Sequence, residues 1–167
     1  FDEKRYFAVG AEKFSLYKMG DLRFAINICE DIWVSDEKNF FPLKSSVGLI
    51  IVPNASPYHI DKISLRQKIL KQRAKESNSF ILYANLVGGQ DELVFDGQSM
   101  FISPRGVVLA CAGAFKEELL ILDLDLNMLP KKSAPKVVKI FSLNLPEKQN
   151  IISPVISRKA LNLSPEE

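Results

Sequence analysis

Three apolar runs separated by polar breaks mark the first half of the chain. Residues 22–29 (LRFAINIC) form the first run, which ends at Glu30 and Asp31 and predicts a strand that enters a turn. Residues 47–53 are a second continuous apolar run, typical of a strand that is buried on both faces of a sheet, and residues 80–87 predict a third strand. The pattern therefore predicts a sheet with a buried centre.

Helical spacing characterises the segment from about residue 60 to residue 77. Its apolar positions repeat on one face, with lysines and arginines opposite. On this pattern Arg66 and Arg73 belong to the charged face, which predicts contact with solvent or with protein outside this chain. Residues 36–46 also have a helical composition. The predicted apolar face of residues 60–77 consists of Ile60, Ile63, Ile69, Leu70 and Ala74.

The second half of the chain has the pattern of antiparallel strands. Residues 99–102 and 107–111 flank a turn at 103–106, in which Pro is second and Gly fourth. Residues 118–126 alternate and predict a last strand. This order predicts an α/β fold whose sheet becomes antiparallel at one side. Side chains expected to pack in its core include Phe95, Phe101, Phe115 and Cys111.

Charge and cysteine usage exclude several classes of protein. The 22 basic and 20 acidic residues leave a net charge of +2, so nothing indicates a nucleic acid or membrane partner. No apolar run approaches the ~18 residues of a membrane-spanning helix. The two cysteines, Cys29 and Cys111, have no CxxC spacing, which argues against disulfides and zinc and favours a soluble protein in the reducing cytoplasm.

The position of Cys29 at the end of an apolar run has two possible explanations. An isolated cysteine at the end of an apolar strand is usually a small buried hydrophobe. A thiol at the point where a buried strand stops and a helical segment begins, however, faces the carboxyl edge of the sheet, near unpaired helix amides. That position is typical of a nucleophile.

Several motifs in the correct order carry a resemblance to a known family. The stretch INICEDIW resembles the nucleophile motif of the nitrilase superfamily, and FDEKRYFAVG resembles its segment just after the catalytic lysine. NASPYH and ANLVGGQDELVFDGQS are similar to the glutaminase domain of glutamine-dependent NAD synthetases. The ending LNLSPEE resembles the junction with their ATP-dependent synthetase domain. The resemblance implies the C-terminal half of an αββα sandwich in residues 1–128 and a linker in residues 129–167.

The resemblance also implies a role for individual residues. Cys29 matches the nucleophile that attacks an amide carbonyl to give an acyl-enzyme and ammonia. The backbone N–H of Glu30 matches an oxyanion donor. Glu3 matches a glutamate that supports the catalytic lysine, although it would otherwise be a solvated residue in a charged run. The general-base glutamate and the lysine belong upstream of residue 1, so the chain alone is expected to be inactive.

Three more residues match positions that recognise glutamine. Trp33 is implied to form a wall of the substrate pocket, and Ser56 to contact the amino-acid end of glutamine. Lys62 matches a cation for the α-carboxylate, and lysine serves there as a point charge without the bidentate fork of arginine. Lys62 on a solvated first helical turn is the alternative. The roles of His59, Asp91 and Glu92 stay open.

The implied function is hydrolysis of glutamine to supply ammonia for NAD synthesis from the adenylated nicotinic acid dinucleotide. No cofactor is expected in this segment, and ATP and Mg²⁺ are expected in the synthetase domain. Expected partners are that domain, an N-terminal half and further copies of the enzyme. A stand-alone nitrilase-type amidase is an alternative, but it should end after the last strand. A catalytically dead scaffold domain is another, but it should have lost Cys29, Ser56 or Lys62.

Overall fold

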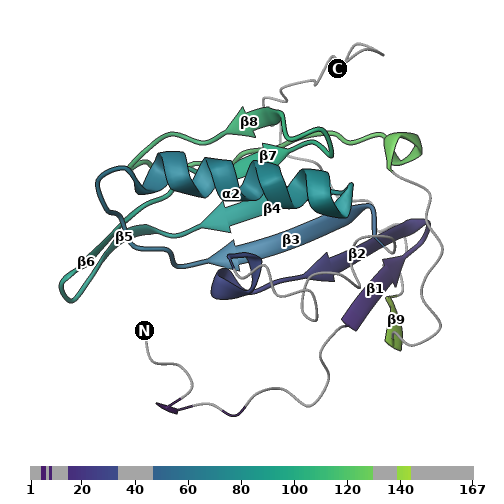
Figure 1. Cartoon of the computed structure of the whole chain (residues 1–167), viewed down its shortest axis with the longest axis horizontal. Helices are drawn as coiled ribbons and strands as arrows, with labels where there is room; N and C mark the ends of the chain where they lie inside the picture. Colours follow the sequence, from purple (N-terminus) through teal and green to yellow (C-terminus); the bar gives the residue numbers. More distant parts are fainter. Residues whose placement is uncertain (1–4, 7, 9–14, 34–46, 130–138, 144–167) are drawn as a thin grey trace, which may run out of the picture.

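A seven-stranded sheet forms the body of the protein within residues 5, 6, 8, 15–33, 47–129 and 139–143, which are those that the computed structural model describes. The strand order is β8-β7-β4-β3-β2-β1-β9 (Figure 1). A separate hairpin of β5 and β6 projects from one end. The strands of the main sheet are β1 (Ser15–Met19), β2 (Leu22–Ile26), β3 (Leu49–Asn54), β4 (Phe80–Asn85), β7 (Met100–Ile102), β8 (Val108–Cys111) and β9 (Lys139–Leu143).

The predicted buried strands form the centre of this sheet. β2, β3 and β4 run parallel, in the register Phe24↔Leu49↔Phe80. β7 and β8 add antiparallel strands beside β4, which confirms the predicted α/β class and the antiparallel side. The parallel arrangement places the carboxyl ends of β2, β3 and β4 at one edge, where ligands bind in open α/β sheets.

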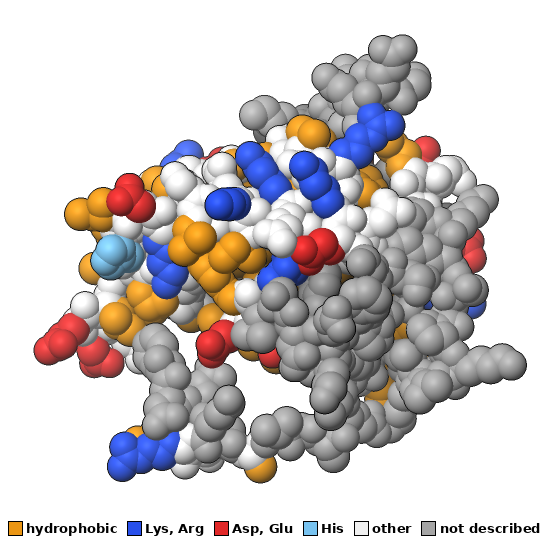
Figure 2. Space-filling model, viewed as in Figure 1, with side chains coloured by type: hydrophobic (Ala, Val, Ile, Leu, Met, Phe, Trp, Pro, Cys, Tyr) orange, Lys and Arg blue, Asp and Glu red, His pale blue; other side chains and the backbone are white. Residues whose placement is uncertain are grey.

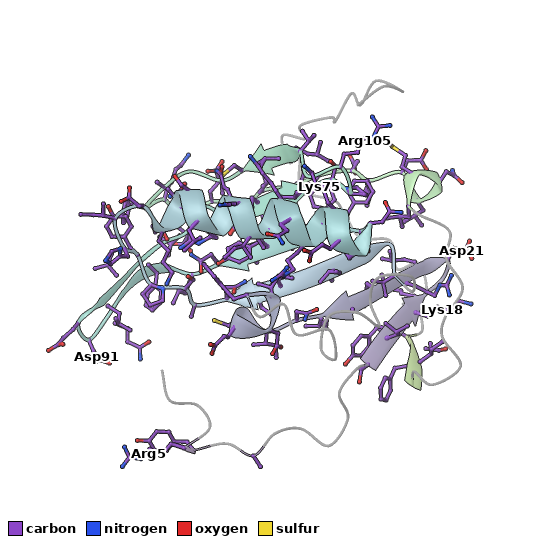
Figure 3. The ribbon with its side chains drawn as sticks, in the orientation of Figure 1. Arg5, Lys18, Asp21, Lys75, Asp91 and Arg105 are labelled. Carbon is purple, nitrogen blue, oxygen red and sulfur yellow. The ribbon has the colours of Figure 1, made fainter. Side chains whose placement is uncertain are left out.

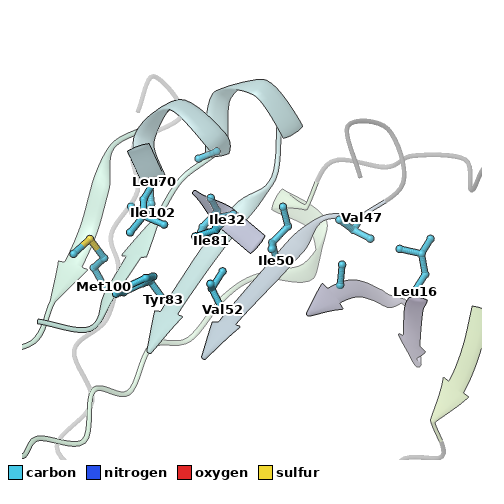
Figure 4. Packing of buried hydrophobic residues seen from close by; sticks show 12 residues of the cluster. Leu16, Ile32, Val47, Ile50, Val52, Leu70, Ile81, Tyr83, Met100 and Ile102 are labelled. Atoms are coloured by element: carbon cyan, nitrogen blue, oxygen red, sulfur yellow. The ribbon is translucent and has the colours of Figure 1, made fainter. Parts of the chain in front are cut away.

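Each face of the sheet carries its own apolar cluster, because successive side chains of a strand point to opposite faces. One face packs beneath helix α2 (Lys62–Ser77) (Figures 1 and 4). Ile50, Ile81 and Ile102 are its central residues. The opposite face is built around two aromatic rings, those of Phe80 and Phe101, whose centres lie 5.4 Å apart.

Helix α2 confirms the predicted segment at residues 60–77 and part of its predicted apolar face. Leu70 and Ala74 are buried against the sheet. Ile60 precedes the helix and is exposed, so its predicted place in the buried face is wrong. The outer surface over α2 carries basic side chains (Figure 2), as the amphipathic pattern predicts for the lysines of this helix.

The turn between β7 and β8 confirms its prediction at residues 103–106. The N–H of Gly106 donates to the carbonyl of Ser103 at 2.8 Å. Gly106 has φ +77°, and a Cβ there would meet Cε of Lys75 at 2.6 Å. The backbone conformation of this turn therefore favours glycine, whereas the flexible end of the Lys75 side chain could move away from an added Cβ.

Some regular elements differ from the sequence predictions. Residues 118–126 were predicted as a strand, but they form no strand: Leu122 makes a single bridge and Leu126–Met128 form a short 3₁₀ helix, η4. Strand β1 and the strands of the hairpin, β5 (Val87–Gln90) and β6 (Leu93–Asp96), had no prediction. β9 pairs in parallel with β1, so part of the predicted linker has regular structure. The boundary at residue 128 stays a prediction, and the helix predicted at 36–46 lies outside the described residues.

Two predictions of core packing are wrong. Cys111 is exposed, because it ends β8, the edge strand of the sheet. Phe115 is exposed too, although its ring makes an edge contact with Tyr58, whose ring centre lies 5.2 Å away. The predicted burial of Phe95 and Phe101 is confirmed.

Candidate active site

Cys29 lies just beyond the end of β2, at the carboxyl edge of the parallel strands. It is the first residue of a short 3₁₀ helix, η2 (Cys29–Ile32), and is partly exposed. Its φ is +48°, a left-handed conformation that costs a non-glycine residue energy and that clusters at functional sites. The strand end, the strained turn and the partial exposure of Cys29 together fit a nucleophile better than a core residue.

The turn that carries Cys29 is held on both sides. Oδ2 of Asp31 accepts a hydrogen bond from the N–H of Ile28 at 2.8 Å, so the acidic residue closes the turn. The N–H of Asn27 donates to the carbonyl of Ile51 at 3.0 Å, which fixes the chain before the cysteine to β3. The first amides of a helix have no acceptor within it, so the N–H of Glu30 is available in principle as an oxyanion donor. That role of Glu30 stays a prediction.

Helix α2 is tied to this turn by Arg73. Its Nε donates to the carbonyl of Ile32 at 3.0 Å and its Nη2 to that of Trp33 at 3.2 Å. Arg73 is only 4% exposed, so its predicted place on the charged outer face is wrong. The acceptors are backbone atoms about forty residues earlier in the chain, which the helical pattern does not reveal.

Two of the predicted binding residues meet across the same turn. Nζ of Lys62 lies 5.7 Å from the centre of the Trp33 ring, within the range of a cation–π contact. Lys62 is the first residue of α2, and Trp33 follows η2 directly. The fold thus brings a cation and an aromatic surface to the neighbourhood of Cys29. Their roles in binding a substrate stay predictions.

Asn85, which the sequence analysis did not single out, holds the backbone of Ser56 in place. The N–H of Ser56 donates to Oδ1 of Asn85 at 2.9 Å, and Nδ2 of Asn85 donates to the carbonyl of Gly97 at 2.9 Å. Asn85 therefore joins the loop after β3 to the loop before β7. Ser56 itself is 3% exposed, so the predicted contact with a substrate depends on a small, nearly closed surface.

A buried ion pair lies beneath Ser56. Nη1 and Nη2 of Arg66 donate to the two carboxylate oxygens of Asp96 at 3.2 and 3.1 Å, and the side chains are 0% and 1% exposed. Nε2 of Gln98 also donates to Asp96, at 2.9 Å. The predicted solvent or external contact of Arg66 is therefore wrong. A signal was available, since Arg66 precedes the buried Leu70 by one helical turn.

The aromatic ring of Tyr83 completes this buried group. Cζ of Arg66 lies 5.8 Å from the centre of the ring, and Tyr83 is 1% exposed. Burial raises the pKa of Tyr83 to about 12. The charge of Arg66 and the hydroxyl of Ser56 act to lower this pKa, and the charge of Cys29 acts to raise it. The phenol is thus within electrostatic reach of the candidate nucleophile.

The remaining candidates lie on the surface or outside the described residues. His59 is exposed, and its Nδ1 lies 2.7 Å from the carbonyl oxygen of Ile60. Asp91 and Glu92 are exposed between β5 and β6, and Asp91 lies at the tip of the projecting hairpin (Figure 3). Glu3 lies outside the described residues. Among the described side chains, no group of three or more His, Cys, Asp or Glu residues is arranged to hold a metal ion. None of the described helices is long and apolar enough to cross a membrane.

The sequence pattern of one family matches most of the chain. The family described as "Carbon-nitrogen hydrolase" matches residues 1–131, and the chain belongs to this family. Over 132 residues the chain is 46% identical to the glutamine-dependent NAD(+) synthetase of Aquifex aeolicus, which covers 79% of this chain and 23% of that protein. It is 43% identical over 128 residues to that of Thermotoga maritima, covering 76% and 22%. The chain thus spans less than a quarter of the length of these relatives.

Solved structures agree with the family. The glutamine-dependent NAD(+) synthetase of Acinetobacter baumannii superimposes with a TM-score of 0.65 at 38% identity, covering 71% of this chain and 22% of that one. A mutant of the amidase from Nesterenkonia sp. AN1 superimposes with a TM-score of 0.59 at 29% identity, covering 66% and 41%. In that structure the acetamide moiety of fluoroacetamide is bound covalently at the active-site cysteine. These likenesses confirm the predicted nitrilase-type fold and the resemblance to NAD synthetases.

Proposed function

We propose that this chain carries the nucleophile of a glutaminase and that the full-length protein is a glutamine-dependent NAD synthetase. One observation supports this proposal above the others: Cys29 occupies a strained, accessible turn at the carboxyl edge of the sheet, beside the Lys62–Trp33 contact. The relatives in Aquifex aeolicus and Thermotoga maritima are both named glutamine-dependent NAD(+) synthetase, and they match 79% and 76% of this chain.

The reaction at Cys29 proceeds in two steps. The general base takes the proton of the thiol as its sulfur attacks the amide carbonyl of glutamine; a C–S bond forms, the C–N bond breaks, and the leaving nitrogen takes that proton and departs as ammonia. Water then cleaves the thioester to give glutamate and restores the thiol. The N–H of Glu30 stabilises the oxyanion in both steps. The general base and the catalytic lysine come from protein outside this chain, with Glu3 in support, so the chain alone is inactive.

Recognition of glutamine rests on three residues around this turn. Trp33 provides an apolar wall for the methylene groups. Lys62 pairs with the α-carboxylate, because an ammonium group at a helix start remains free to rotate toward an anion. Ser56 contacts the amino-acid end of the substrate through its hydroxyl.

The later steps belong to other parts of the full-length enzyme. A synthetase domain uses ATP and Mg²⁺ to activate the nicotinic acid dinucleotide, and ammonia from Cys29 completes NAD. The enzyme works in the cytoplasm as a homo-oligomer. The N-terminal half of the glutaminase domain is its other intramolecular partner.

Substitution of Cys29 in the full-length enzyme tests this proposal. Cys29→Ala should abolish the release of glutamate from glutamine and glutamine-driven NAD formation, while NAD formation from added ammonia continues. Cys111→Ala is the matched control, because Cys111 lies on the exposed edge strand, and it should change neither reaction. Unchanged use of glutamine by Cys29→Ala would contradict the proposal, and loss of both reactions would show a general defect in folding.

Hydrolysis of a different amide is the second candidate function, and the likeness to the Nesterenkonia amidase favours it. It predicts that small amides without an α-carboxylate are better substrates than glutamine. A comparison of kcat/KM for glutamine and for acetamide distinguishes the two candidates. No Cys29-dependent hydrolysis of either amide would instead indicate a scaffold domain.

A further inference from the structure

Tyr83 is a buried residue whose hydroxyl oxygen has no hydrogen-bond partner among the described residues. It lies on β4 with its ring toward the face beneath α2 (Figure 4). Within the part of the chain that the structure describes, its hydroxyl oxygen is buried and makes no hydrogen bond of acceptable geometry. Buried polar groups are nearly always satisfied, so an exception of this kind calls for an explanation.

The surroundings of this hydroxyl are polar and face the candidate site. Ser56 and Tyr83 are close, because Asn85, two residues after Tyr83, accepts a hydrogen bond from the Ser56 N–H. The Ser56 hydroxyl acts on the ionisation of Tyr83 and lowers its pKa, although the two groups are not in hydrogen-bond geometry. A change of the Ser56 rotamer redirects its hydroxyl without moving the backbone that Asn85 holds.

The positive charge of Arg66 decides which hydroxyl would donate in a hydrogen bond between Tyr83 and Ser56. The guanidinium group of Arg66 lies against the Tyr83 ring, with Cζ 5.8 Å from its centre, and Asp96 holds it there. A positive charge beside a phenol makes the O–H a stronger donor and a weaker acceptor. Tyr83 is therefore suited to donate to Ser56, and a serine that accepts one bond still has its own O–H to donate elsewhere.

We propose that Tyr83 is a positioning residue for substrate binding: its O–H donates to Oγ of Ser56 when an amino-acid amide binds, and the Ser56 O–H then donates to the α-carboxylate of that substrate. The inference rests on the proposed glutaminase function. It makes the Tyr83–Ser56 pair a selector for an anionic group at the end of the substrate remote from the amide. Lys62 supplies a positive charge for the same group, and the O–H of Ser56 supplies a directional hydrogen bond to it.

Tyr83→Phe in the full-length enzyme tests this role. The KM for glutamine should rise by roughly 5- to 10-fold, the size expected for one lost hydrogen bond, with kcat changed by less than about 2-fold. The thermal unfolding midpoint should stay the same or rise, because the free enzyme loses no hydrogen bond. Tyr17→Phe is the matched control, since Tyr17 packs on the opposite face of the sheet, and its KM should not change.

A double-mutant cycle shows whether Tyr83 acts through Ser56. Ser56→Ala should raise the KM at least as much, and adding Tyr83→Phe to it should have no further effect. With γ-aminobutyramide, which is glutamine without its α-carboxylate, Tyr83→Phe should leave kcat/KM unchanged. Independent effects of the two substitutions would overturn the inference, as would a lowered unfolding midpoint for Tyr83→Phe or an equal loss with both amides.

The result can be separated from the fate of the proposed function. If Cys29→Ala abolishes glutamine hydrolysis and Tyr83→Phe leaves the KM unchanged, only the role of Tyr83 is refuted. If Cys29→Ala still hydrolyses glutamine, the glutaminase proposal fails, and the role of Tyr83 fails with it.

Discussion

Nζ of Lys62 lies 5.7 Å from the centre of the Trp33 ring, although the two residues are almost thirty positions apart in the sequence. The first residue of α2 thus meets the residue that follows the Cys29 turn. The contact holds the ammonium group near the candidate nucleophile while it stays partly exposed. A cation in this place is better suited to bind an anionic group of a substrate than to form a structural ion pair.

Removal of this cation should weaken the binding of glutamine. We expect Lys62→Met to raise the KM for glutamine about 10-fold or more in the full-length enzyme, because a charge-assisted contact is lost, with a smaller change in kcat. Lys62→Arg should keep most of the affinity. Lys68→Met, an exposed position on the same helix, is the control and should have no effect on steady-state glutaminase kinetics. An unchanged KM for Lys62→Met would place Lys62 outside the site.

Loss of the link between α2 and the Cys29 turn should lower stability and activity together. Arg73→Met removes two charge-assisted bonds to the carbonyls of Ile32 and Trp33 and the ion pair with Glu76, so we expect a loss of roughly 2 to 4 kcal/mol in the free energy of unfolding. Urea denaturation measures it. Lys75→Met, at an exposed position of the last turn, should change stability by less than about 0.5 kcal/mol. Equal stability of the two variants would show that these bonds contribute nothing.

The buried pair of Arg66 and Asp96 should behave as a unit. Asp96→Asn leaves the guanidinium without its counter-charge and should cost about 3 to 5 kcal/mol. Adding Arg66→Met should recover part of this loss, because no unpaired charge then remains buried. The shift of the urea midpoint for the two single variants and the double variant measures the coupling. Strict additivity would mean that the two charges do not interact appreciably.

Stability above pH 10 should depend on Tyr83. Burial raises its pKa from 10.0 to about 12 in the folded protein, so the fold favours the neutral phenol. As the pH rises through 10, the phenol of Tyr83 ionises first in the unfolded chain. The contribution of Tyr83 to the free energy of unfolding, about 2 to 3 kcal/mol at most, is therefore present below pH 10 and lost between pH 10 and 12. Tyr83→Phe should therefore lose less stability than the wild type as the pH rises above 10. Parallel pH dependences, measured by urea denaturation, would show that the phenol titrates alike in both states.

The sequence by itself determined the elements whose signals are local. Continuous apolar runs identified β2, β3 and β4, because an apolar run between polar breaks is a local signal for a strand. Leu70 and Ala74 defined the buried face of α2, and the order of the segments predicted the α/β class. The motif around Cys29 gave the candidate nucleophile, because a thiol at the end of a buried strand has a recognisable place.

Only the tertiary structure decided what depends on partners distant in sequence. Arg66 and Arg73 follow the pattern of solvated residues, yet both are buried, because their acceptors come from Asp96 and from the backbone of residues 32 and 33. β1 has a mixed polar composition and is a strand because β2 and β9 pair with it on either side. The exposure of Cys111 follows from its place on an edge strand. Local spacing can place a residue on the buried face of a helix, as it does for Arg66 one turn before Leu70, but the acceptor that pairs with a buried charge is decided by the assembled sheet and helix.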